Sequence, residues 1–81
     1  MSIESLEDLK TAIQGIVVKD YGDFKRKTIL YLNRYSETID TSEAEVRREL
    51  FKLKWHIQFH PTGEIEPTRN WTLTQLDQLA I

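Results

Sequence analysis

The sequence predicts a single α+β domain over residues 1–81, in which about three helices are followed by a β-hairpin and a short C-terminal helical turn. Two observations predict this class. Apolar residues recur every three or four positions up to residue 55, as in amphipathic helices, and they alternate with polar residues after it, as in strands. One domain is expected because 81 residues supply too little apolar surface for two independent cores.

An apolar stripe predicts the first helix, from about Ser5 to Val18. Ser2 or Ser5 can cap it, and acidic residues follow in the first turn, where the helix dipole favours them. Gly15 lies inside the stripe, so we expect the helix to be weakened there or to end near it. The stripe consists of Ile3, Leu6, Leu9, Ile13, Ile16 and Val17.

Two further helices are predicted by capping residues and apolar spacing. Asp23 is placed to cap a second helix from Phe24 to about Tyr35. Thr41 or Ser42 begins a third helix, in which Trp55 is expected to lie in the core. The core stripe of the third helix consists of Val46, Leu50 and Leu53, with Phe51 beside it.

A hairpin is predicted from His56 to Thr74, because apolar and polar residues alternate there with the period of a strand. Pro61-Thr-Gly63 predicts its turn, since proline presets the first bend and glycine accepts the positive φ that follows. A last helical turn through Leu76 and Leu79 completes the chain.

Composition excludes several classes of protein. Charged residues are 30% and apolar residues 40%, as in folded globular proteins. The absence of cysteine excludes disulfides, thiolate metal sites and a catalytic thiol. No apolar run approaches the roughly 18 residues of a membrane span, and the first residues are acidic where a signal peptide is basic. We therefore expect a cytoplasmic protein that does not enter a membrane.

No residue pattern predicts catalysis, a cofactor or a metal. His56 and His60 share one face of the predicted strand, but strand positions four apart are separated by roughly 13 Å, too far to hold one ion unless the segment is helical. The serines lie where caps and turns are predicted, and the three glycines are isolated, so no glycine-rich phosphate loop occurs. The sequence therefore predicts a protein that is not an enzyme.

Basic residues gather on the predicted second and third helices, although the net charge is −2. Clustered cations can bind phosphates by counterion release, whereas the ordinary alternative is a solvated surface in which glutamates at helical spacing pair with them. The candidate nucleic-acid contacts are Lys25, Arg26, Lys27, Arg47, Arg48 and Lys52. Three helices followed by a hairpin resemble, in element order alone, a winged helix-turn-helix domain, which implies a third helix in the major groove and a hairpin beside it.

The preferred interpretation is a small interaction or accessory module that binds another protein. A chain without site chemistry, with amphipathic helices and with many aromatic residues suits that class. The candidate partner interface is Trp71, Leu76 and Leu79. The alternatives are a winged-helix-type regulator that binds DNA and, for the oligomeric state, a homodimer.

Overall fold

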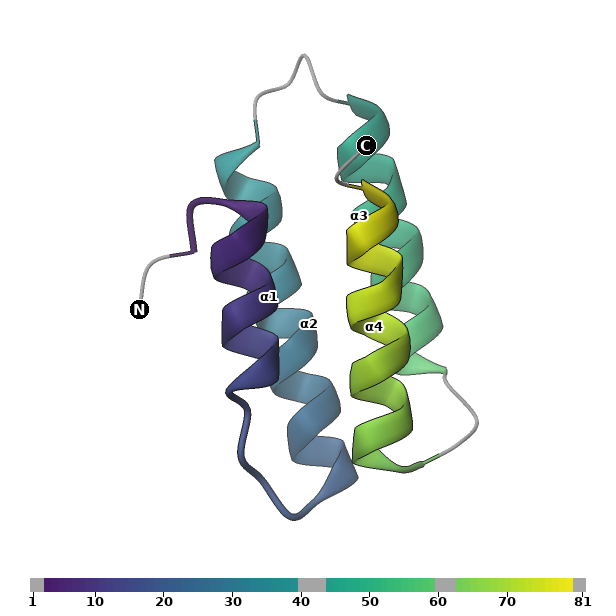
Figure 1. Cartoon of the computed structure of the whole chain (residues 1–81). Helices are drawn as coiled ribbons and strands as arrows, with labels where there is room; N and C mark the ends of the chain where they lie inside the picture. Colours follow the sequence, from purple (N-terminus) through teal and green to yellow (C-terminus); the bar gives the residue numbers. More distant parts are fainter. Residues whose placement is uncertain (1–2, 40–43, 60–62, 80–81) are drawn as a thin grey trace.

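Four antiparallel helices form a bundle in this computed structural model, which describes residues 3–39, 44–59 and 63–79 (Figure 1). The helices are α1 (Leu6–Gln14), α2 (Tyr21–Thr38), α3 (Ala44–Gln58) and α4 (Ile65–Leu79). α1 and α3 each pack against α2 and α4, so the chain runs up and down around one core.

The first two helices begin at capping side chains. The Ser5 hydroxyl accepts a hydrogen bond from the backbone N–H of Asp8 at 3.1 Å, which confirms the predicted cap. α1 ends at Gly15, where the sequence predicted a weak point. α2 starts one turn earlier than predicted, because Asp20 is its cap and accepts from the N–H of Asp23 at 3.2 Å.

The core is built from one buried stripe on each helix. Leu53 and Ile57 of α3 pack with residues of the other three helices in one cluster, and Ile3 and Ile16 are buried beside α1. The stripes are Leu9, Ala12 and Ile13 on α1, Phe24, Thr28 and Leu32 on α2, Leu50, Leu53 and Ile57 on α3, and Thr68, Thr72 and Leu76 on α4.

The predicted α+β class is wrong, because the part of the chain that the structure describes contains helices and no strand. α3 continues through the first predicted strand to Gln58, and α4 occupies the second. Pro61 lies outside the described residues, while Gly63 has the positive φ of 68° that the turn required. The hairpin on which the winged-helix resemblance depended is therefore absent from the described residues. The last predicted helical turn is the end of α4.

Two local features explain the error in α4. Pro67 is its third residue, in the first turn, where a backbone N–H has no partner within the helix and proline is tolerated. Thr68 and Thr72 occupy core positions that usually hold aliphatic residues, so the helical stripe is hidden in the sequence. The Thr72 hydroxyl donates to the Thr68 carbonyl at 2.8 Å, which lets a polar side chain be buried.

Thr28 tests how well this core satisfies its polar groups. Its hydroxyl is buried without a hydrogen-bond partner among the described residues, which costs free energy. We expect Thr28→Val to raise the free energy of unfolding by about 1 kcal/mol in urea titrations, because valine has the same shape without the hydroxyl. Thr72→Val is the control and should gain less, since it loses a hydrogen bond. A lower stability of Thr28→Val would contradict the assignment.

An ion pair joins α1 to α4. The ammonium group of Lys10, whose side chain is 20% exposed, contacts the carboxylate of Asp77 at 2.5 Å and that of Glu7 at 3.4 Å. The hydrogen bond to Asp77 raises the pKa of Lys10 above its ordinary value, and burial opposes it. Because the pKa is raised on folding, the stabilisation is complete below the ordinary lysine pKa and is lost as the pH rises through the folded pKa.

We therefore expect Asp77→Asn to lower the melting temperature at about pH 7. The difference from the unmodified protein should shrink above about pH 10.4, where unfolded lysine loses its proton. Melting curves by circular dichroism from about pH 7 to about pH 11 measure it, with Glu7→Gln as a control of smaller effect. A difference that grows with pH would contradict the role of Lys10.

Candidate functional site

Three large aromatic side chains line the outward face of α3. Phe51, Trp55 and Phe59 follow one another at intervals of four residues, and they are 55%, 50% and 65% exposed. Phe51 and Trp55 meet edge to face with ring centroids 6.3 Å apart, while Trp55 and Phe59 stack at 5.2 Å. We call these three residues the aromatic strip. Its rings contact one another and leave a continuous apolar surface on the outside of the bundle.

The strip is exposed because α3 uses another face for the core. Leu50, Leu53 and Ile57 are buried and point toward the other helices. Since successive residues of a helix are rotated by about 100°, side chains that lie between these positions in sequence point away from the core. Trp55 therefore lies outside the core, contrary to the prediction made for it.

Cations flank the strip on the side of α2. A groove of about 290 Å³ lies between α2 and α3, and Arg47, Arg48, Phe51 and Lys54 form its α3 wall. The Lys54 ammonium lies 5.1 Å from the centre of the Phe51 ring and 3.5 Å from the side-chain oxygen of Asn33. No Asp or Glu among the described residues lines this groove. Its wall therefore combines positive charge with an aromatic ring.

A second hollow between α2 and α3 lies at the opposite end of α3. Lys25, Arg26, Ile29 and Gln58 line it, again without an acid from the described ranges. The Lys25 ammonium donates to the Gln58 carbonyl at 3.1 Å, which places a cation at the negative end of the α3 dipole. We call these two hollows together the α2–α3 seam. It has positive charge at both ends.

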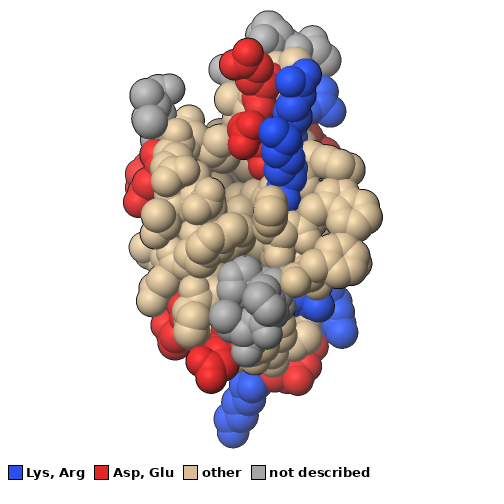
Figure 2. All heavy atoms as spheres, turned by 90° about the vertical axis from the view of Figure 1, so that its right-hand side faces the viewer, with Lys and Arg blue, Asp and Glu red and all other residues tan. Residues whose placement is uncertain are grey.

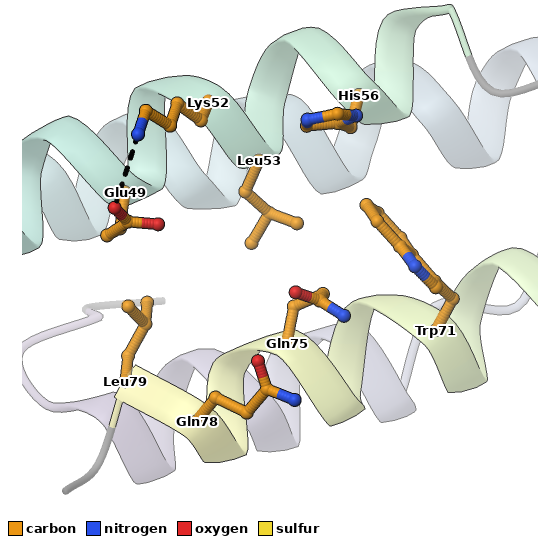
Figure 3. Close-up of a pocket in the computed structure, with 8 residues that line it drawn as sticks. All are labelled: Glu49, Lys52, Leu53, His56, Trp71, Gln75, Gln78 and Leu79. Carbon is orange, nitrogen blue, oxygen red and sulfur yellow. Dashed lines mark ion pairs between the residues drawn. The ribbon is translucent and has the colours of Figure 1, made fainter.

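A different groove, of about 430 Å³, lies between α3 and α4 (Figure 3). Trp71 faces His56 with ring centroids 6.0 Å apart, and Leu53 points into the groove from α3. Lys52 lies at its rim and pairs with Glu49 at 3.5 Å. Figure 2 shows uncharged side chains across the middle of the face formed by α3 and α4, with charges of both signs side by side above them. This groove is uncharged at its centre and nearly neutral at its rim.

The structure separates the predicted nucleic-acid contacts. Lys25, Arg26, Arg47 and Arg48 line the α2–α3 seam, whereas Lys52 lines the other groove. Lys27 is exposed on α2 and lines neither. Arg26 pairs with Asp23 at 3.2 Å and Lys52 with Glu49, while Arg47 and Arg48 have no ion pair within the described ranges. Four of the six predicted contacts therefore border the α2–α3 seam, two at each end, and the other two lie outside it.

The predicted partner interface is divided between core and surface. Leu76 is fully buried in the core, whereas Trp71 and Leu79 are half-buried and line the α3–α4 groove. The aromatic strip was not predicted from the sequence. Its signal was the spacing of four between Phe51, Trp55 and Phe59, which only a helix that continues past Trp55 makes into one face.

The metal site considered from the histidines depends on His60, which lies outside the described residues. Among the residues that are described, no group of three potential metal ligands occurs. No described helix is long and apolar enough to span a membrane.

Comparisons with protein-family models, curated proteins and solved structures find no match to this chain.

The strip can be distinguished from the core by stability. We expect Trp55→Ala to lower the free energy of unfolding by less than about 1 kcal/mol, because half of the side chain is already in water. Leu53→Ala, two residues earlier on the buried face, should cost about 2 to 5 kcal/mol. Urea titration measures both. Equal losses would show that Trp55 supports the core.

Proposed function

We propose that this chain is a non-enzymatic interaction module that binds a partner protein through the aromatic strip of α3. The observation that carries the proposal is the exposure of Phe51 and Trp55 on one face of α3 and of Phe59 directly after its end, each at least half exposed. Contiguous apolar patches on small domains mark interaction sites, and tryptophan is among the residues that most often dominate binding energy.

The rigidity of the strip supports the same function. Phe51 and Trp55 are held on a regular helix, the Phe59 backbone N–H still donates to the Trp55 carbonyl at 3.2 Å, and the rings contact one another, so little side-chain freedom remains to be lost on binding. A partner that covers the three rings removes apolar surface from water without any rearrangement of the bundle. Binding residues that are held on rigid helices in this way keep the geometry that the partner recognises.

DNA binding of the winged-helix type is not proposed, because the wing is absent from the described residues and two of the candidate cations are neutralised. Arg26 and Lys52 already pair with acids of their own helices. The remaining cations lie beside an apolar strip, which phosphate does not require.

Photo-crosslinking in cells that express the protein tests the proposal. Phe59 is replaced by p-benzoylphenylalanine, which keeps an aromatic ring in the strip, and Leu30 is replaced in the control. Leu30 is a suitable control because it is 45% exposed on α2 and belongs neither to the strip nor to the lining of the seam. We expect an adduct with another protein from position 59 and none from position 30.

The captured protein is then purified and its affinity measured by isothermal titration calorimetry. We expect Trp55→Ala to weaken binding by about 30-fold or more, as for a tryptophan at the centre of an interface, and Leu30→Ala to leave it unchanged. The proposal is wrong if both positions give the same adducts, if neither gives any, if the adduct is nucleic acid, or if Trp55→Ala binds normally.

A further inference from the structure

We propose that the partner segment is an acidic amphipathic helix, which lies along the α2–α3 seam with its apolar face on the aromatic strip and its carboxylates on the cations of the seam. This inference rests on the proposed function and adds the chemistry of the partner. Its starting point is charge: the chain has a net charge of −2, yet both hollows of the seam are lined by cations without an acid from the described residues.

Arg47 and Arg48 are the cations most suited to a carboxylate ligand. Both are exposed, and neither forms an ion pair in the part of the chain that the structure describes. A guanidinium binds a carboxylate through two parallel hydrogen bonds, so each arginine can hold one acidic side chain in a defined position. They also lie near the start of α3, where the helix dipole adds positive potential.

The length of the aromatic strip fits two turns of a partner helix. Phe51 and Phe59 are eight residues apart, which on a helix corresponds to about 12 Å. Apolar residues at i, i+4 and i+7 of a partner helix cover the same length. Arg47 comes one turn before Phe51, so acidic residues one turn beyond the apolar anchors of the partner would reach it. Lys54, which lies over the Phe51 ring, is a third contact between these ends.

A second copy of the chain fits this surface less well. Arg47 and Arg48 lie at one end of the seam, and Lys25 and Arg26 lie at the other. A copy that presents its own seam, in either direction, therefore brings cations against cations at both ends, and only Arg26 of these four has an acid, Asp23, to offset its charge among the described residues. Like charges that face each other across an interface weaken it. A partner with negative charge on both sides of its apolar face meets no such repulsion.

Nucleic acid is the other polyanion to consider, since bases stack on exposed aromatic rings. Tracking a phosphate backbone requires a row of available cations, however, and Arg26 is paired with Asp23 while Lys25 is bonded to the Gln58 carbonyl. Arg47 and Arg48, which form no ion pair with a described residue, are two cations at one end of the seam, and they suit a few carboxylates better than a continuous phosphate chain.

Three labelled peptides of one helical design test the inference. Each has leucines at i, i+4 and i+7, flanked by glutamate in the first peptide, glutamine in the second and lysine in the third. Fluorescence anisotropy at about 50 mM salt measures their affinities. We expect the glutamate peptide to bind about 10-fold or more tightly than the glutamine peptide, and the lysine peptide to bind weakest.

Charge reversal locates the effect. Arg47→Glu with Arg48→Glu should weaken the glutamate peptide by about 10-fold or more and should improve binding of the lysine peptide. The control is Lys27→Glu with Arg34→Glu, which makes the same change in net charge at exposed α2 residues outside the seam and should have an effect within about 2-fold.

The inference is overturned if the glutamine peptide binds as tightly as the glutamate peptide, if both double variants lose the same affinity, if no peptide binds, or if a single-stranded oligonucleotide binds more tightly and responds to the same reversal. The proposed function is judged separately by the crosslinked partner. If that protein depends on Trp55 but tolerates reversal of Arg47 and Arg48, the docking function stands and the acidic chemistry of the partner is wrong.

Discussion

The rotational register of α3 determines both the core and the outer surface of this bundle. Leu50, Leu53 and Ile57 turn inward, and this commits the opposite face of the same helix to solvent. The alternative register, which would bury Phe51 and Trp55, would also turn the Arg48 side chain toward the core, because it lies three positions before Phe51. Burying an unpaired guanidinium costs several kcal/mol, of order what a large aromatic gains on burial. The exposed strip thus accompanies the burial of the three aliphatic residues on the opposite face, and it leaves Arg48 in water.

Three of the four helices could be predicted from the sequence because most of their core positions hold apolar residues at helical spacing. Ser5 and Gly15 further defined α1. α4 could not be predicted in this way, because Thr68 and Thr72 occupy its core positions and both residues favour strands. Their burial depends on hydroxyl hydrogen bonds, such as that from Thr72 to the Thr68 carbonyl, which no local pattern reveals. Threonine alternates with larger side chains over five residues of α4, and so short a pattern is compatible with both the helical and the strand period.

Only part of the candidate site could be predicted from the sequence. Composition identified the cations, and helical spacing predicted glutamates as their partners, as Lys52 and Glu49 show. Arg47 and Arg48 form no ion pair with a described residue, and Glu43, one turn before Arg47, lies outside the described residues. Helical spacing predicted the buried positions Leu50 and Leu53, but whether the aromatic residues beside them are covered follows only from tertiary packing. A strand period assigned after Trp55 then separated Phe59 from the two rings that it joins.

Under the proposed function, the aromatic strip and the α2–α3 seam make different contributions to partner binding. Apolar contact with the rings supplies affinity that is insensitive to salt, whereas the arginines select the partner by charge and make association faster at low salt. The two contributions meet at Phe51, whose ring lies under the Lys54 ammonium. A cation over an aromatic ring is worth little in water and more when water is removed. A partner that covers Phe51 also removes water from the contact between its ring and the Lys54 ammonium, so hydrophobic docking strengthens this cation–π contact. An acidic side chain of the partner near Lys54 then replaces the water that the ammonium loses.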